Sequence, residues 1–220
     1  MDPEVIRSSR RTLGLTIERD GSIVLRVPED CPQSVIDSFI EQKKPWIYRK
    51  LAERRLHEQE PPRKEYVSGE GFPYLGRTHA LHIVDGKVPL RLYRGYFELD
   101  WRLVDRGRDV FILWYRQHAR EVIERRVDRY WDRFSRKPSG VRVLDLKYRW
   151  GSCSADGVLN FHWKSILAPM TIVDYIVVHE MVHLIEPNHT PKFWDLVGSI
   201  IPDYEQRKGW LKVNGRHLDI

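Results

Sequence analysis

The sequence predicts an α+β fold, with a sheet-rich N-terminal region followed by a more helical C-terminal region. Before residue 101, apolar residues alternate with polar ones in short runs, which is typical of strands. From residue 109 the apolar residues recur every three or four positions, which indicates a long helix. The chain has 220 residues, 41% hydrophobic and 31% charged. This ordinary globular composition excludes a disordered or collagen-like chain.

A β-hairpin and a helical region are predicted at the N-terminus. Segments 13–17 and 23–27 each alternate apolar and polar residues, and Asp20-Gly21 between them favours a turn. Residues 34–56 carry a helical pattern that Ser34 can cap. We expect Pro45 to divide this region into two helices, because proline lacks the backbone donor of a helix interior.

The next part of the chain predicts a linker and a small sheet. The linker is expected over residues 58–64, which include Pro61-Pro62. Short apolar runs between residues 66 and 101, broken by glycine and proline, predict an antiparallel sheet. We therefore expect an N-terminal region of residues 1–107, with a hairpin, short helices and a small sheet, packed on a core of residues 108–220.

A long amphipathic helix is predicted between Asp109 and Pro138. Its apolar stripe recurs at helical spacing and consists of Ala119, Ile123, Val127, Tyr130 and Phe134. Beyond it, a strand opening at residue 141 is expected to run toward residues 148–154, and a turn at 155–157 leads into a second strand over 158–163. The long helix should bury its stripe against a core.

The basic surplus of the chain is local. Residues 101–150 hold 14 Lys and Arg against 7 Asp and Glu, whereas the rest of the chain holds 23 against 24. Many of these bases lie in the helical stretch 116–137, which could contact the phosphates of DNA. Acidic residues interleave with them at i,i+4 spacing, so we favour a solvated helix face and keep DNA association as the alternative.

Cysteine content and hydropathy predict a soluble protein of a reducing compartment, the cytoplasm. Cys31 and Cys153 are too few for a disulfide framework, and no Cys-x-x-Cys pair is present to hold a structural zinc. No stretch approaches the ~18 uncharged apolar residues of a membrane span. The opening Met-Asp-Pro-Glu is acidic and no apolar run follows it.

The strongest functional pattern is His179-Glu180-Met-Val-His183 within an apolar segment. Thr171 and Asp174 form a capping-box pattern ahead of it, so we expect a buried helix of about four turns. On such a helix His179 and His183 lie one turn apart on the same face, where they can share one metal ion. Glu180 lies about 100° round the axis. It can therefore act as a general base on a metal-bound water without being a ligand.

A third ligand is needed, because a catalytic zinc usually has three protein ligands and one open position for water. We favour His189, since Pro187 ends one helix and Thr190-Pro191 begins another, which places this histidine in a tight corner. Four of the nine histidines fall between residues 162 and 189, which favours a metal site over buried core histidines. The carboxylate alternatives for the third ligand are Glu186, Asp195, Asp203 and Glu205.

Several of these segments together resemble a known family. They are Trp150-Gly-Ser-Cys-Ser, the strand from Gly157 to Trp163, the stretch Asp174 to Glu180, Asn188-His189-x-x-x-Phe193-Trp194, and the tail from Pro202 to Leu211. They resemble the YgjP-like zinc metallopeptidases, which are similar to SprT-type zinc proteases. The resemblance implies a zincin-like core, in which an active-site helix lies beside an antiparallel sheet. It also implies one zinc ion per chain, with His179, His183 and His189 as ligands and Glu180 as the catalytic acid/base.

The histidine spacing equals that of the metzincins, which the sequence nevertheless excludes. Glu186 stands where metzincins carry glycine, and no methionine follows His189. A thiol hydrolase built on Cys153 and His162 is also disfavoured, because a cysteine beside a turn is more often a small packing residue.

The expected zinc ligands and the general base Glu180 together predict a zinc-dependent peptidase that cleaves amide bonds of a peptide or protein substrate. Segment 150–154 is the strand expected to bind an extended peptide. Candidate stabilisers of the oxyanion, which the sequence does not rank, are Tyr148, Arg149, Tyr175, His162 and His217. Two alternatives remain: a DNA-associated protein with a structural zinc and the basic helix 116–137, and a SprT-like protease of DNA-linked proteins.

Overall fold

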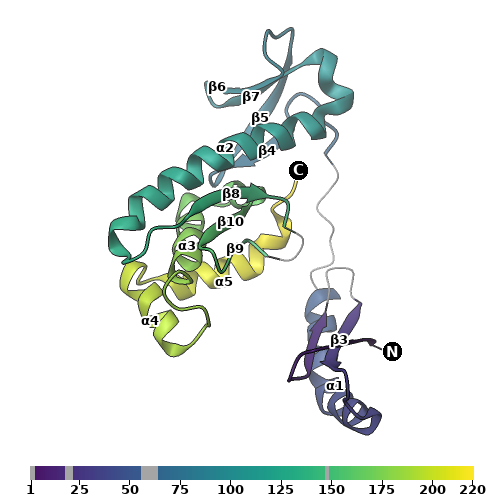
Figure 1. Cartoon of the computed structure of the whole chain (residues 1–220). Helices are drawn as coiled ribbons and strands as arrows, with labels where there is room; N and C mark the ends of the chain where they lie inside the picture. The colour runs from purple at the N-terminus through teal and green to yellow at the C-terminus, as the bar shows by residue number, and fades with distance from the viewer. Residues whose placement is uncertain (1–2, 18–21, 56–63, 147–148) are drawn as a thin grey trace. The chain divides into compact units, whose positions relative to one another are not determined.

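The computed structural model describes residues 3–17, 22–55, 64–146 and 149–220, without the side chains of residues 53–55. Helices and strands are both present, so the α+β prediction is confirmed. By its internal contacts the chain divides into two compact units, Met1–Glu60 and Pro61–Ile220, which are described separately below (Figure 1).

The first unit is a small sheet with one helix. Its three strands, in the spatial order β1-β3-β2, are β1 (Glu4–Ser8), β2 (Gly14–Ile17) and β3 (Ile23–Pro28). Strands β2 and β3 pair antiparallel, which confirms the hairpin, although its Asp20-Gly21 turn lies outside the described residues. Strand β1 pairs parallel to β3. Leu25, Val27 and Ile36 form the buried cluster of this unit.

The helix of this unit, α1 (Gln33–Arg55), continues through Pro45. The prediction of two helices separated by this proline is therefore wrong. A proline removes one backbone hydrogen bond and bends a helix, but the turns on either side keep their own bonds.

The second unit begins with a four-stranded sheet in the order β4-β5-β7-β6. Its strands are β4 (Gly71–Tyr74), β5 (Arg77–Val84), β6 (Leu90–Tyr93) and β7 (Tyr96–Asp100). Because β5 and β7 run parallel, the sheet is mixed, and the prediction of a wholly antiparallel sheet is wrong. A parallel pair forms between segments distant in sequence, so alternation within each strand does not reveal it.

A short 3-10 helix, η1 (Trp101–Arg106), leads into the long helix α2 (Gly107–Tyr130), and η2 (Trp131–Arg133) follows. Of the predicted stripe, Ala119, Ile123, Val127 and Phe134 are buried and Tyr130 is half-buried. The helix ends at Tyr130, earlier than the predicted stop at Pro138, so Phe134 lies beyond it. The small sheet packs on the same helix, because the rings of Phe72 and Phe111 stack at 4.0 Å. By internal contacts, the small sheet and α2 thus belong to the same compact unit, and the division of the chain falls at residue 60.

A second, three-stranded sheet follows α2. It consists of β8 (Gly140–Leu144), β9 (Gly151–Cys153) and β10 (Val158–His162), in the order β8-β10-β9. Strands β9 and β10 form the predicted hairpin, in which Gly157 has a φ of 81°. The single strand expected from residue 141 toward residue 154 is instead two strands, β8 and β9. Strand β8 pairs parallel to β10, so this sheet is mixed where an antiparallel one was expected. Strand β9 lies at the edge and pairs with β10 alone among the described strands.

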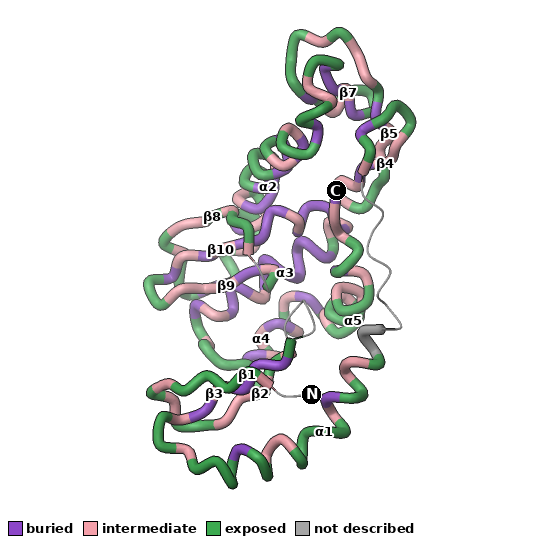
Figure 2. Tube along the Cα trace, turned by 90° about the vertical axis from the view of Figure 1, so that its right-hand side faces the viewer, coloured by how far each residue is buried: buried purple, intermediate pink, exposed green. Residues whose placement is uncertain are grey.

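The C-terminal helices complete the unit. They are η3 (Trp163–Leu167), α3 (Met170–Val182), α4 (Pro191–Ile200), α5 (Tyr204–Asn214) and η4 (Gly215–His217). Helix α3 is buried along most of its length, as the purple tube in Figure 2 shows. None of the described helices is long and apolar enough to cross a membrane.

Asp174 does not belong to a capping box, which corrects the sequence prediction. Helix α3 begins after Pro169, and no side chain caps its first turn. Instead both carboxylate oxygens of Asp174 accept hydrogen bonds from Arg126 of α2, one of them 2.7 Å long from Nη2. A buried carboxylate needs such a partner, and this requirement outweighs the local capping pattern.

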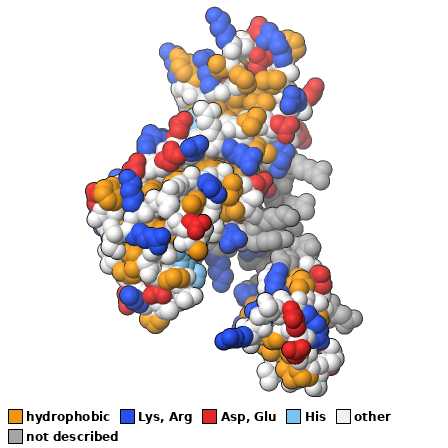
Figure 3. All heavy atoms as spheres, viewed as in Figure 1, with side chains coloured by type: hydrophobic (Ala, Val, Ile, Leu, Met, Phe, Trp, Pro, Cys, Tyr) orange, Lys and Arg blue, Asp and Glu red, His pale blue; other side chains and the backbone are white. Residues whose placement is uncertain are grey.

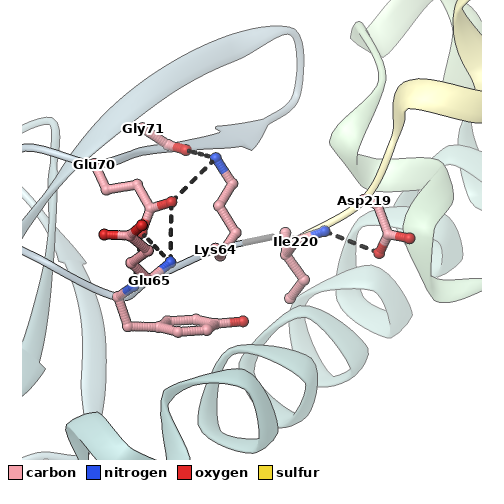
Figure 4. Close-up of polar contacts among 7 residues, drawn as sticks. Lys64, Glu65, Glu70, Gly71, Asp219 and Ile220 are labelled. Carbon is pink, nitrogen blue, oxygen red and sulfur yellow. Dashed lines mark hydrogen bonds and ion pairs between the residues drawn. The ribbon is translucent and has the colours of Figure 1, made fainter. Parts of the chain in front are cut away.

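The end of the chain packs beside the beginning of the second unit (Figure 4). Ile220 belongs to the same buried cluster as Tyr66. Lys64 donates a 2.8 Å hydrogen bond to the carbonyl oxygen of Gly71, and Asp219 forms a 2.8 Å ion pair with Lys164. The C-terminal residues therefore add to the core that supports α2 and η3.

Candidate metal centre

Three histidines converge at the C-terminal end of α3. His179 and His183 lie one helical turn apart, and His189 comes from the connection between α3 and α4. The Nε2 atoms of His179 and His189 are 2.9 Å apart, and one ring nitrogen from each histidine lies within 4.8 Å of the others. The structure thus brings together the three histidines that the sequence singles out.

The first turn of α4 positions His189. Thr190 accepts a 3.3 Å hydrogen bond at Oγ1 from the backbone N–H of Phe193, and Pro191 occupies the start of the helix, as predicted. The indole of Trp194 stacks on the His189 ring at 5.5 Å. Phe193 is fully buried with its ring against all three histidines. The cap and these two aromatic residues therefore hold the His189 ring against α3.

Hydrogen bonding and burial favour the neutral imidazole that binds metals. Nδ1 of His183 donates to the carbonyl oxygen of Glu186 at 3.1 Å, which leaves the Nε2 lone pair available. Burial, and then the charges of the other two histidines and Lys208, lower the pKa of His179 to about 3. The His179 ring is therefore neutral near pH 7, as ligation requires.

The donor set fits a zinc ion. Nitrogen ligands at tetrahedral zinc lie roughly 3.3 Å apart, given Zn–N bonds of about 2.0–2.1 Å. The observed spread of 2.9 to 4.8 Å brackets that separation, so small side-chain shifts would complete the geometry. Nδ1 of His179 is buried without a hydrogen-bond partner in the described structure. The carboxylates of the rival candidates Glu186, Asp195, Asp203 and Glu205 are not part of this cluster.

Glu180 lies beside the histidines and faces strand β9. It is 6% exposed, and burial raises its pKa to about 8 against the opposing charge of Arg149. A Cβ atom added at Gly151 would meet Cγ and Oε1 of Glu180 at 2.6 Å. A glycine is therefore required at this point of β9 for the carboxylate to fit.

A cavity of about 790 Å³ opens over these side chains. Its walls are β9, the turn after it and one face of α3, and His179, Glu180, His183 and His189 lie within it. Histidine side chains are visible at the surface in Figure 3. The cluster is thus accessible to a ligand from solvent.

The structure separates the candidate oxyanion stabilisers. Arg149 and Tyr175 line the cavity, whereas His162 and His217 do not, and Tyr148 lies outside the described residues. Burial, with a smaller effect of Glu180, raises the pKa of Tyr175 to about 12. Its hydroxyl therefore remains a hydrogen-bond donor across the physiological pH range.

Cys153 also lines the cavity, but it does not have the properties of a nucleophile. Burial and the charge of Glu180 raise the pKa of its thiol, which opposes formation of the reactive thiolate. His162 accepts a hydrogen bond at Nδ1 from the backbone N–H of Lys164, and its Nε2 lies 3.4 Å from Asp145. These contacts support the packing role favoured from the sequence.

Three residues at this site carry no functional prediction from the sequence. Gly151 makes room for Glu180, Trp194 supports His189, and Arg136 lines the cavity. Gly151 and Trp194 stand within recognisable motifs, which was the available indication. Arg136 belongs to the basic stretch 116–137, for which the sequence favours a solvated helix face, because one sequence does not show which bases face a cavity.

Comparison with protein families gives one match that covers most of the chain. The family model described as YgjP-like, metallopeptidase domain, matches residues 11–214 of the 220-residue chain. The search of curated proteins finds no match.

Proposed function

The chain belongs to the YgjP-like metallopeptidase family, and from this premise we propose that it is a zinc-dependent peptidase with a zincin-like active site. His179, His183 and His189 would hold one zinc ion, and Glu180 would act as the general acid/base. The observation that carries the proposal is the convergence of three imidazoles beside a buried carboxylate. Family membership supports a metal-dependent peptidase, and the donor set supports zinc.

The chemistry divides between the ion and the chain. Bound zinc would supply Lewis acidity and lower the pKa of its water toward 7. Glu180 in its ionised form takes the proton of the attacking water and delivers it to the leaving amine. A nearby divalent charge favours that ionised form, whereas burial alone raises the pKa to about 8.

Tyr175 is our proposed donor to the developing oxyanion. It lies one turn before His179 on α3, and the two rings are 5.8 Å apart. It is 5% exposed, lines the cavity, and forms no hydrogen bond through its hydroxyl within the described residues. A fixed O–H donor in a water-poor site stabilises developing negative charge more strongly than one in water.

Strand β9 is our proposed binding edge for the substrate. Its outer side pairs with no other described strand, and it passes directly beside Glu180. An extended peptide can add to such an edge by backbone hydrogen bonds, which bring its carbonyl groups to the carboxylate. Family membership and this open edge together support a peptide or protein substrate.

The alternative of a DNA-associated protein with a structural zinc has less support. Two arginines of the 116–137 stretch are engaged within the fold, Arg126 by Asp174 and Arg120 by Glu124. A structural zinc also gives no reason for a glycine that admits a buried carboxylate beside the histidines. Four expectations from the sequence stay predictions. They are DNA association, a SprT-like action on DNA-linked proteins, the cytoplasmic location, and the packing of residues 1–107 on the core.

Digestion of a peptide library tests the proposed function. The wild type with one equivalent of zinc should cleave members of the library, and Glu180→Gln should keep the metal but lose cleavage. The matched control Glu186→Gln changes a carboxylate outside the histidine cluster and should keep cleavage. Equal cleavage by wild type and Glu180→Gln would remove Glu180 from the mechanism.

A further inference from the structure

Two arginines that form no hydrogen bond or ion pair within the described part of the chain line the cavity. Arg136 belongs to the connection between η2 and β8, and Arg149 precedes β9 by two residues. Neither forms a hydrogen bond or an ion pair with another described residue. Glu180 is the sole acidic residue among those lining the cavity. The cavity therefore presents two unused guanidinium groups to whatever binds there.

The two arginines lie near opposite ends of β9. A Cβ atom added at Gly157, in the turn beyond Cys153, would lie 3.3 Å from Nη2 of Arg136. Arg149 is at the other end, where its charge acts on Glu180. The three residues of β9 span about 10 Å at the rise of a strand. A peptide paired to this edge would run past both guanidinium groups.

We propose that this site selects peptides that carry acidic side chains on both sides of the bond to be cleaved, with Arg149 and Arg136 binding the two carboxylates. The proposal rests on the peptidase function above and adds the substrate class. Guanidinium groups bind carboxylates through paired, charge-assisted hydrogen bonds. Because the two arginines lie beyond the ends of β9, which is itself about 10 Å long, the acidic residues would be at least about three positions apart.

A peptide fits the cavity better than a nucleic acid does. The unpaired edge of β9 recognises a peptide backbone, whereas base stacking would need free aromatic faces. Trp150 packs closely on Gly215, where an added Cβ would lie 2.9 Å from its ring, and Tyr175 is buried. The side of Trp150 that meets Gly215 and the buried ring of Tyr175 are therefore closed to a base.

Matched peptides measure the proposed selectivity. Each acidic peptide is compared with a twin in which Gln replaces Glu, so that only the charge differs. The wild type should cleave the acidic peptide with a kcat/KM about fivefold higher for each carboxylate, as expected for a partly exposed ion pair. Arg136→Glu and Arg149→Glu should each lower this acidic-to-neutral ratio at least tenfold, because like charges then repel.

The control is Arg142→Glu, which makes the same charge change on β8, at the opposite edge of the sheet. It should leave the acidic-to-neutral ratio unchanged. The neutral variants Arg136→Gln and Arg149→Gln should give intermediate ratios, which separates loss of the contact from repulsion. A ratio that falls equally in Arg142→Glu would reduce the effect to overall charge and overturn the proposal.

Binding of the same labelled peptides to Glu180→Gln protein separates this proposal from the peptidase function. Tighter binding of the acidic peptide without cleavage by the wild type supports the selectivity and counts against the peptidase. If the acidic peptide and its neutral twin are bound and cleaved equally, the selectivity is overturned and the peptidase function stands. If a short oligothymidylate binds through the same arginines more tightly than the acidic peptide does, the arginines form a phosphate site and the proposal is overturned. If no peptide is bound or cleaved, both the selectivity and the peptidase function are overturned.

Discussion

Gly151 and Glu180 are in such close contact that any side chain at position 151 would overlap the carboxylate. An added Cβ would lie 2.6 Å from both Cγ and Oε1 of Glu180. The contact joins the edge strand β9 to the histidine-bearing helix α3, so it sets the distance between the proposed substrate edge and the proposed base.

Gly151→Ala should therefore displace Glu180 and lower peptidase activity at least tenfold, because small misplacements of a catalytic group are costly. Overpacking should also reduce the free energy of unfolding by about 1–3 kcal/mol. Steady-state kinetics, zinc content and urea unfolding measure the three properties, and zinc content should stay near the wild-type value. The control Gly209→Ala lies in α5 with open space around the added Cβ and should not lower activity. Wild-type kinetics in Gly151→Ala would contradict this role of Gly151.

Tyr175→Phe tests the proposed oxyanion donor. Removal of one such donor typically lowers kcat by about 10²–10³-fold. We expect that loss in kcat with little change in KM and with zinc retained, since the phenyl ring keeps its packing. Tyr204→Phe removes a hydroxyl from the ring stacked on Trp194 and should leave kcat near the wild-type value. Equal kcat in wild type and Tyr175→Phe would leave the donor unidentified among the cavity residues.

The burial of Glu180 predicts how stability depends on pH in metal-free protein. Its pKa is raised from 4.5 to about 8 in the folded state, so between these values the folded protein holds a proton that the unfolded chain releases. The contribution of Glu180 to stability is complete below about pH 4.5 and is lost as pH rises toward 8. Glu180→Gln removes this dependence.

Urea unfolding in a chelating buffer at about pH 5 and pH 8 measures this contribution of Glu180 to stability. The wild type should lose stability relative to Glu180→Gln by on the order of a few kcal/mol between the two pH values. The lowered pKa of His179 acts in the opposite direction in both proteins, so it cancels in the difference. Parallel pH profiles would show that Glu180 is ionised in the folded protein throughout.

The buried ion pair between Asp174 and Arg126 should stabilise the attachment of α3 to α2. Asp174→Ala leaves the guanidinium without its partner in a largely buried position and should cost about 3–5 kcal/mol of unfolding free energy. The double variant Arg126→Met, Asp174→Leu removes both charges and should recover most of that loss. The exposed pair Arg120 and Glu124 is the comparison, and Glu124→Ala should cost less than about 1 kcal/mol. Equal losses for Asp174→Ala and Glu124→Ala would contradict the assignment.

The parts of the site that depend on local geometry could be predicted from the sequence. A helix places His179 and His183 on one face whatever surrounds it, and Thr190-Pro191 begins a helix by its own chemistry. Asp174 shows the limit of local patterns, because a distant arginine engages a side chain that fits a capping motif. The fit of Gly151 on Glu180 is another tertiary contact, and no spacing in the sequence encodes it.

In the sheets, too, local pairing could be predicted from the sequence and pairing between distant segments could not. The hairpins β2–β3 and β9–β10 pair strands that are close in the sequence, and alternation with turn residues predicts them. The parallel pairs β1–β3, β5–β7 and β8–β10 join segments separated by other structure, and no turn residue marks them. Pairing between distant strands is decided by packing on a common core, which a single sequence does not display.

The most direct test of the three-histidine centre is the zinc content of the protein, measured by mass spectrometry on tag-free material dialysed against a mild chelator. The wild type should hold about one zinc per chain, and His189→Ala should hold far less, because two imidazoles make a weak site. His217→Ala changes a histidine outside the cluster and should keep the full content. Full zinc retention in His189→Ala, or none in the wild type, would contradict the three-histidine centre on which the proposed function rests.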